Sequence, residues 1–355
     1  MWYNYLQFIS KILYIQKGGI AMGIKYYPIL KWKKGEQEAL KKMGDFKDDF
    51  YPIIEIVEQC SPNDFFYVLS NCYDAPIYFD VSRFGKEYLE KYIKFINLNK
   101  LKSYPLLYID DLNILDNTEY AMDKFAIKIP IPVDFEGLSF KEILNVLSSY
   151  QNKEINLVLD AGEVIDSRSA NIIFDLYDRY ISDNIDDLYD FENITVCLTS
   201  FPERLDISAG EDMSFKRYDI LIYKKIIEKF RDSKINGKIQ YSDYGVTKST
   251  ETDLDFSKMR YGILPKVKYT TDKQYLVKKG QKDRRNNIFT RSFIDISKEI
   301  VNSPCFYGEH FSYGDKCIYE KANAVDAKPG NSTQWVTYCA NHHLTVLMEQ
   351  LSNLS

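Results

Sequence analysis

Acidic side chains, with a few cations among them, follow most of the short apolar runs in the first two thirds of this sequence. The candidates for chemistry are the carboxylates Glu55, Asp80, Asp160 and Asp243 and the cations Lys31 and Arg83. Carboxylates gathered at one centre can serve as general acid and general base, or hold Mg²⁺ or Mn²⁺ through oxygen ligands. The two cations would then hold an anionic substrate. The pattern does not identify a cofactor, and a divalent ion is compatible with it.

The same residues also have a plain structural interpretation. Acidic side chains are ordinary N-caps of helices, and the edge of a sheet where helices begin is polar in any case. The catalytic interpretation therefore depends on elements that bring these residues to one place.

Eight β-branched or aromatic runs alternate with helical stretches, at an average spacing of about thirty residues, the size of one βα unit. The runs are Tyr27–Trp32, Tyr51–Val57, Ile77–Val81, Tyr104–Ile109, Ala126–Ile131, Ile155–Asp160, Ile194–Thr199 and Lys238–Ser242. The helical stretches are Gly35–Met43, Pro62–Cys72, Lys86–Asn97, Ser139–Tyr150, Ser167–Ile181 and Tyr218–Phe230. Successive apolar positions within the runs indicate parallel strands covered on both faces.

This rhythm predicts an α/β fold, a TIM-like (β/α)8 barrel, in which the ends of the strands meet at one mouth. Glycine-rich nucleotide-binding motifs are absent from the sequence, which disfavours a doubly wound sheet. The fourth crossover, Asp110 to Lys124, is short and polar, so a defective barrel or an open sheet is the alternative.

The pattern changes after residue 245. Lys266–Lys278 is typical of a strand or hairpin, Phe289–Val301 of a helix, and Thr333–Leu351 of a closing helix with Trp335 among its core positions. We therefore expect a barrel over residues 22–245 and a C-terminal α+β appendage over residues 246–355, packed on the barrel. Residues 1–21 have no secretory signal, and Lys17-Gly18-Gly19 can encode a ribosome-binding site. Translation is accordingly expected to begin at Met22, the alternative being a genuine packing helix.

The formal charge of −5 conceals a basic segment. Between Lys258 and Lys298 there are twelve basic residues and three acidic ones, interleaved with aromatic side chains. We single out Lys282, Arg284 and Arg285 as candidates to bind nucleic acid, because clustered cations with aromatics are typical of phosphate-rich partners. The alternative is a solvated hairpin that balances an acidic barrel.

Cysteines and histidines give little support to other chemistry. The six cysteines are scattered without paired spacing, which predicts reduced thiols in a cytoplasm and makes a zinc site of Cys305, Cys317, Cys339 and His342 unconvincing. All three histidines lie after residue 300, so a Ser-His-Asp site would need them to fold over the barrel mouth. Apolar runs are too short to span a bilayer, so we expect no membrane partner.

Several longer segments of the sequence resemble the beta-protein family named after a T-even phage protein. They are Tyr27-Pro28-Ile29-Leu30-Lys31-Trp32-Lys33-Lys34-Gly35-Glu36, Tyr51-Pro52-Ile53-Ile54-Glu55-Ile56, Ser242-Asp243-Tyr244, Phe311-Ser312-Tyr313-Gly314-Asp315, Gly330-Asn331-Ser332-Thr333-Gln334-Trp335 and Asn341-His342-His343-Leu344. The resemblance covers about residues 24 to 347. It implies a phage–host setting in bacteria and phages, and it implies no active-site residues, because the family is largely uncharacterised.

Three of these marker residues fall at the ends of predicted strands one, two and eight. Strands one and eight are neighbours in a closed barrel, so Lys31, Glu55 and Asp243 are predicted to share a pocket. His342, Trp335 and Asp315 would cap that pocket, with His342 and Trp335 contacting the substrate. In the structural alternative Trp335 is core, His342 is a hydrogen-bonded helix histidine, and Gly314-Asp315 is a tight turn.

Two classes of function follow from these residues. The first is a phosphodiester- or nucleotide-directed hydrolase with an acidic site at the barrel mouth. The second is a non-catalytic module of phage defence or counter-defence, which would bind a protein or nucleic acid through the appendage. The sequence does not predict the substrate or the oligomeric state.

Overall fold

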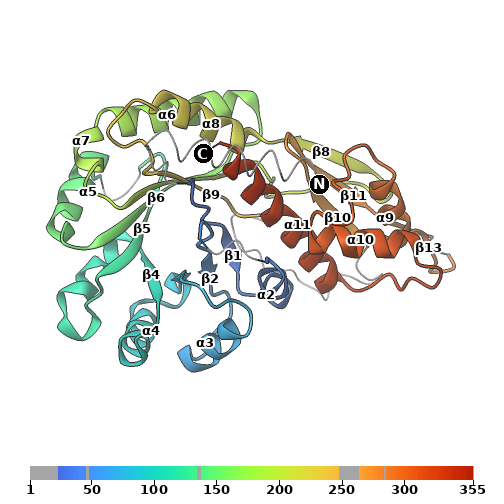
Figure 1. The fold of residues 1–355 in the computed structure, drawn as a ribbon, viewed down its shortest axis with the longest axis horizontal. Helices are drawn as coiled ribbons and strands as arrows, with labels where there is room; N and C mark the ends of the chain where they lie inside the picture. Colours follow the sequence, from blue (N-terminus) through green and yellow to red (C-terminus); the bar gives the residue numbers. More distant parts are fainter. Residues whose placement is uncertain (1–22, 45–47, 134–136, 248–263, 284, 355) are drawn as a thin grey trace, which may run out of the picture.

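The computed structural model describes residues 23–44, 48–133, 137–247, 264–283 and 285–354. Its largest sheet has eight strands, and every neighbouring pair in it is parallel. Around the sheet (Figure 1) the strands are β1 (Ile29–Lys31), β2 (Ile53–Glu55), β3 (Ile77–Asp80), β4 (Ser103–Leu107), β5 (Lys124–Pro130), β6 (Glu154–Glu163), β7 (Asn193–Thr199) and β9 (Ile239–Ser242). The eight predicted strands are confirmed, with boundaries that shift by a few residues.

The first and last strands of this sheet approach one another and nearly close it into a barrel. Tyr26 forms a parallel bridge to Tyr241. The backbone N–H of Tyr27 donates to the carbonyl of Tyr241 at 2.8 Å, and that of Ile29 donates to the carbonyl of Asp243 at 2.7 Å. The sheet is therefore a nearly closed barrel, whereas the sequence had left an open sheet as the alternative.

Side chains of the strands alternate between two apolar layers, as the two-residue period of a strand requires. The inner layer contains Ile29, Ile53 and Tyr78, and the outer layer contains Leu30, Ile54 and Phe79. Because the alternation is regular, the residue that ends each strand faces inward or outward according to its parity. This parity decides which polar side chains meet at the barrel mouth.

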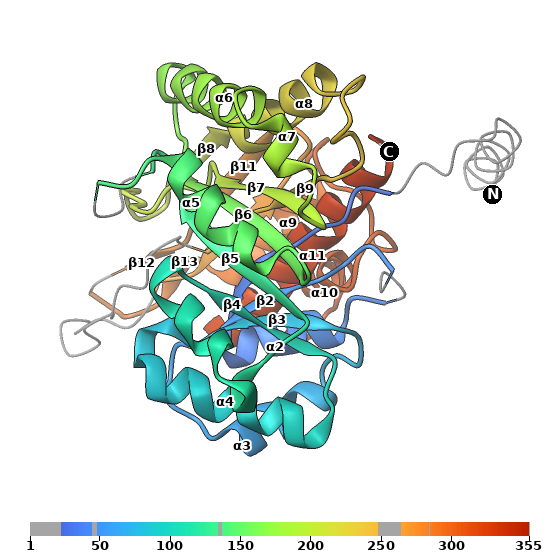
Figure 2. The same cartoon turned by 90° about the vertical axis from the view of Figure 1, so that its left-hand side faces the viewer.

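Helices cover the outer layer (Figure 2, in which β5 and β6 face the viewer). They are α2 (Lys34–Lys41), α3 (Pro62–Ser70), α4 (Lys86–Asn99), α5 (Phe140–Leu147), α6 (Ser167–Ser182), the short α7 (Ile185–Leu188) and α8 (Tyr218–Lys229). Several begin at a side-chain cap, as at Ser139, whose hydroxyl accepts from the Glu142 N–H while the Glu142 carboxylate accepts from the Ser139 N–H. The weak fourth crossover contains only the 3₁₀ turns Ile109–Asp116 and Thr118–Tyr120.

A second core lies beside the barrel. A three-stranded antiparallel sheet of β10 (Lys266–Thr270), β11 (Gln274–Lys279) and β8 (Asp212–Lys216) packs with α9 (Phe293–Val301) and α10 (Tyr313–Asn323). A small hairpin of β12 (Gln281–Lys282) and β13 (Phe289–Arg291) extends from it. Strand β8 comes from the loop after β7, so part of this region precedes residue 246.

Three local predictions differ from the structure. Phe289–Val301 is not one helix, because Phe289–Arg291 pairs with β12 and the helix begins only after the Ser292 cap. Gly314 and Asp315 stand in the first turn of α10, which the sequence did not predict as a helix. Strand β8 was also missed. The predicted start at Met22 and the nature of residues 1–21 lie outside the described residues.

The last helix, α11 (Ser332–Ser352), joins the two cores. Trp335 and Tyr338 near its start belong to the second core, whereas Leu344, Leu347 and Leu351 belong to the outer layer of the barrel. Figure 1 shows α11 running from α10 along α2 to the side of β9. None of the helices in the described part of the chain combines the length and the apolar character needed to span a bilayer.

Close helix packing around α11 depends on two glycines. A Cβ at Gly35 in α2 would lie 2.7 Å from Cγ1 of Val336, and one at Gly314 in α10 would lie 2.2 Å from the carbonyl oxygen of Tyr338. The Tyr338 oxygen is backbone and cannot move aside without shifting α11.

Gly314→Ala is therefore expected to lower the free energy of unfolding by about 3 kcal/mol, although alanine favours a helix elsewhere. Urea unfolding followed by circular dichroism measures the change. Lys316→Ala, on an exposed position of the same helix, is the matched control. Equal stability of the two variants would contradict the packing described for α10 and α11.

Candidate functional site

Three predicted site residues lie in register at the mouth of the barrel. Lys31 pairs with Glu55 across β1 and β2, and Glu55 pairs with Asp80 across β2 and β3. The residues before them, Leu30, Ile54 and Phe79, belong to the outer layer, so the three charged side chains face inward. Lys31 and Asp80 are 7% and 9% exposed, which places them within a recessed site.

The Asp80 carboxylate is held by two donors. One oxygen accepts from the backbone N–H of Ser82 at 2.9 Å, and the other accepts from the hydroxyl of Tyr108 at 3.1 Å. Tyr108 follows β4, so the next strand supplies the group that orients this carboxylate. A carboxylate fixed in this way is positioned for general-base chemistry.

Asp160 also lies at the mouth, in an ion pair. Its Oδ2 is 2.9 Å from Nζ of Lys128 and accepts from the Tyr244 hydroxyl at 2.5 Å, while Lys128 donates to the same hydroxyl at 2.7 Å. Burial alone would raise the pKa of Asp160, but Lys128 and these hydrogen bonds outweigh it and lower that pKa below its ordinary value. Asp160 is therefore ionised at neutral pH, and Lys128 is its counter-ion.

A carboxyl of opposite character lies in the first turn of α2. Glu36 is 5% exposed, and its burial raises its pKa to about 8, although the charges of Lys31 and Lys268 oppose the shift. Glu36 is thus largely protonated at pH 7. Acid and base roles are often divided between carboxyls whose pKa values are pushed apart in this way. Lys268 comes from β10, so the C-terminal region contributes a cation near the barrel mouth.

Among the described residues, no three histidine, cysteine, aspartate or glutamate side chains converge into a group able to hold a metal ion. Mg²⁺ is often held by only one or two carboxylates together with substrate phosphates, so the Mg²⁺ or Mn²⁺ compatible with the sequence pattern stays a prediction.

The other predicted substrate-binding cation, Arg83, lies apart from this set. It stands in the 3₁₀ turn after β3, and its side chain is exposed. The structure thus brings Lys31, Glu55 and Asp80 together with Asp160 in the inner face of the mouth and leaves Arg83 on the surface.

Asp243 is not brought to the mouth, because it faces the outer side of the barrel. Its carboxylate accepts from the Tyr26 hydroxyl at 2.7 Å and lies 3.1 Å from Nε2 of His343 in α11, whose Nδ1 is 3.0 Å from the Thr270 hydroxyl. Asp243 and His343 are both fully buried. Burial favours the neutral acid, but His343 and Tyr26 outweigh it and lower the pKa of Asp243 below its ordinary value. The predicted shared pocket of Lys31, Glu55 and Asp243 is therefore not formed.

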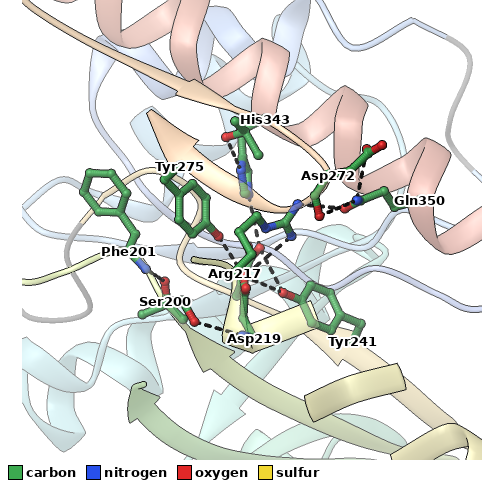
Figure 3. Close-up of polar contacts among 12 residues, drawn as sticks. Ser200, Phe201, Arg217, Asp219, Tyr241, Asp272, Tyr275, His343 and Gln350 are labelled. Carbon is green, nitrogen blue, oxygen red and sulfur yellow. Dashed lines mark hydrogen bonds and ion pairs between the residues drawn. The ribbon is translucent and has the colours of Figure 1, made fainter. Parts of the chain in front are cut away.

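The network around Asp243 extends through a second buried carboxylate, Asp219 (Figure 3). Asp219 accepts from the hydroxyls of Tyr275 at 2.7 Å and Tyr241 at 3.1 Å, and it lies 3.5 Å from Nη2 of Arg217. Arg217 in turn donates from Nη1 to the side-chain oxygen of Gln350 at 2.7 Å. Groups from the barrel, from β11 and from α11 therefore meet in one polar cluster without exposed charge.

His342 and Trp335 point away from the mouth into protein. Nδ1 of His342 is 2.7 Å from the Asp315 carboxylate and Nε2 is 2.7 Å from the Thr270 carbonyl, while the Trp335 indole donates to the Pro329 carbonyl and stacks on Phe293. These hydrogen bonds and the ring stacking favour the structural alternative, in which Trp335 is a core residue and His342 is a hydrogen-bonded helix histidine. A role for them in substrate binding stays a prediction.

The basic segment is partly neutralised within the protein. Lys278 and Arg291 form ion pairs with Asp212 and Glu299. Lys282 in β12 lies 5.0 Å from the ring centre of Phe289, and Arg285 is exposed. Arg284 lies outside the described residues. The cationic surface available to nucleic acid is therefore smaller than the count of charges indicates.

Sequence reasoning missed Lys128, Tyr244 and Glu36 as parts of the mouth. The sequence does contain a signal for Lys128. A single lysine between Ile127 and Ile129 in a buried strand needs a polar or charged partner, because a buried charge without one is costly. Glu36 had none, since its raised pKa arises from burial under the C-terminal region.

The raised pKa of Glu36 makes stability depend on pH. Its protonated form is favoured by folding, so its contribution is complete below about pH 4.5 and is lost as the pH rises through about 8. We therefore expect the melting temperature to fall less between pH 5 and pH 9 in Glu36→Gln than in the wild type. Thermal unfolding of both proteins at the two pH values measures this difference. Glu38→Gln, at a partly exposed position of α2, is the control. An identical pH dependence in wild type and Glu36→Gln would show that Glu36 is not buried as described.

No protein with a curated description matches the chain. A family model described as "Beta protein" matches residues 26–348, which include every barrel strand, the mouth residues and the buried histidines of α11. This match confirms the resemblance found in the sequence, and the chain belongs to the Beta protein family.

Proposed function

We propose that the barrel mouth is the active site of a hydrolase that acts on phosphodiesters or nucleotides. The observation that supports this most is the register of Lys31, Glu55 and Asp80 on three adjacent strands, where a cation stands beside two inward-facing carboxylates. Strand ends at the mouth of a parallel barrel are where catalytic groups of such folds gather.

In this proposal each group has a role suited to its surroundings. Asp80, oriented by Tyr108, takes a proton from a water molecule as the water attacks phosphorus. Lys31 balances the negative charge on the phosphoryl oxygens in the transition state. As the bond from phosphorus to the leaving oxygen breaks, the neutral Glu36 gives that oxygen its proton. Glu55 keeps Lys31 and the water in place, and the Lys128–Asp160 pair forms the fixed opposite wall.

The proposal includes a finer description of the fold. We infer that the nearly closed barrel is TIM-like and that α11 takes the place of the eighth outer helix, since α11 packs along α2 and contributes Leu344 and Leu347 to the outer layer. In this description, the strands of the barrel lie within residues 22–245 and the appendage spans residues 246–355. Helix α11 belongs to the appendage in the sequence but packs on the outside of the barrel.

The setting in which the protein works is also part of the proposal. All six cysteines are free thiols, which fits a reducing cytoplasm. The phage–host context rests on the family resemblance alone.

The test of the mouth uses purified protein with a panel of RNA, DNA and nucleotides, and mass spectrometry to identify products. Asp80→Asn should lower turnover by about a hundredfold or more, because it removes the base without changing side-chain size. Asp183→Asn, at the C-terminal cap of α6, removes an exposed carboxylate and is the matched control. Full turnover in a correctly folded Asp80→Asn protein would remove this site from the mechanism.

A second function, nucleic-acid binding without catalysis, is favoured by one feature of the β12–β13 hairpin. Ile288 and Phe289 are 61% and 43% exposed beside Lys282 and Arg285, so apolar and cationic groups share one projecting surface. Base stacking on such aromatics together with phosphate contacts is typical of single-strand binding.

For this function, Lys282→Gln with Arg285→Gln should weaken RNA or DNA binding. The slope of log affinity against log salt concentration should also become shallower by about 1.4 to 1.8, the change expected for two lost phosphate contacts. Fluorescence anisotropy across a salt series measures both effects. Lys91→Gln with Lys94→Gln on α4 controls for total charge. Equal slopes for the hairpin variant and the wild type would exclude the hairpin as the binding surface.

A further inference from the structure

A groove of about 1150 Å³ lies where α8 begins, and none of the residues of the barrel mouth line it. Its walls come from the start of α8, the β10–β11 turn, the loop before α10 and the end of α11. These segments belong to both cores, so the groove exists only because the C-terminal region packs on the barrel. Its volume is sufficient for a ligand of small-molecule size.

The groove is cationic. Lys216, Lys224 and Lys273 line it with exposed side chains, and none of these three amines is paired with a carboxylate of the described residues. Two acids, Asp272 and Glu349, also line it, and Asp272 accepts hydrogen bonds from Tyr307 and Gln350. The three lysines therefore outnumber the two carboxylates.

Arg217 lies in the floor of the groove and is fully buried. Its Nη2 atom lies 3.5 Å from the Asp219 carboxylate, and its Nη1 atom donates to oxygens of Thr271 and Gln350, the latter a groove residue (Figure 3). Asp219 balances the charge of Arg217, so the excess positive charge of the groove comes from its three lysines.

One wall is aromatic. Tyr307 and Phe311 have ring centres 4.5 Å apart and both line the groove. A flat ring placed against these side chains would gain stacking and apolar burial, while the lysines opposite would meet negative charge.

We propose that this groove is a nucleotide-binding site separate from the barrel mouth. The base lies against Tyr307 and Phe311, and the phosphates contact Lys216, Lys224 and Lys273 above Arg217. This site needs no turnover at the mouth, and it stands whether or not the mouth is catalytic.

The test is isothermal titration calorimetry of the full chain with ATP, adenosine and inorganic triphosphate, in the Asp80→Asn background to prevent turnover. ATP should bind more tightly than either fragment. Lys224→Ala and Lys273→Ala should each weaken ATP binding by about tenfold, the effect of losing one charge-assisted contact. Lys225→Ala is the matched control, because Lys225 is the neighbouring exposed lysine on α8 and does not line the groove.

Three results would overturn the proposal. ATP that does not bind at all would exclude a nucleotide site. Binding that persists unchanged in both Lys224→Ala and Lys273→Ala would place ATP elsewhere, and its loss in Lys31→Ala would then assign it to the barrel mouth. Triphosphate that binds as tightly as ATP would exclude a role for the aromatic wall. The substituted lysines are exposed, so circular dichroism should confirm that each variant folds.

Discussion

Placing Asp243 and Asp219 away from water commits this protein to a set of polar partners, because a buried carboxylate is stable only when its oxygens accept hydrogen bonds or meet a cation. The partners come from three places. Tyr26 and Tyr241 belong to the closing strands of the barrel, Tyr275 belongs to β11, and His343 belongs to α11. Barrel closure and the docking of the C-terminal region therefore stabilise one another. Losing the partners from the barrel or those from the C-terminal region would leave a buried carboxylate without its hydrogen bonds.

The sites of the protein depend on this docking. The same packing that satisfies Asp243 brings β10 over the start of α2, where Lys268 acts on the buried carboxyl of Glu36. It also places the β10–β11 turn and the end of α11 against α8, which creates the cationic groove. Mouth and groove share none of the residues named for them, and each combines residues that are distant in the sequence.

Much of the fold follows from local sequence patterns. The eight strands and the helices between them have the βα spacing that a parallel barrel needs, and Lys31, Glu55 and Asp80 come together because they end neighbouring strands. Asp243 also follows a strand, but it is one residue beyond β9 with the parity of the outer layer, so it turns away. Nothing local in the sequence reveals that parity. The partners of Asp243 lie 217 and 100 positions away in the sequence, at Tyr26 and His343, and the raised pKa of Glu36 also depends on burial by distant segments. Composition and spacing do not encode such contacts.

In the proposed function the mouth, and not the basic hairpin, holds the phosphodiester. A crystal structure of Asp80→Asn with a nonhydrolysable dinucleotide tests this placement. We expect density for the phosphate inside the barrel mouth, in contact with Lys31 and beside the position of Asp80. A complex in which the dinucleotide occupies the β12–β13 hairpin while the mouth stays empty would contradict it.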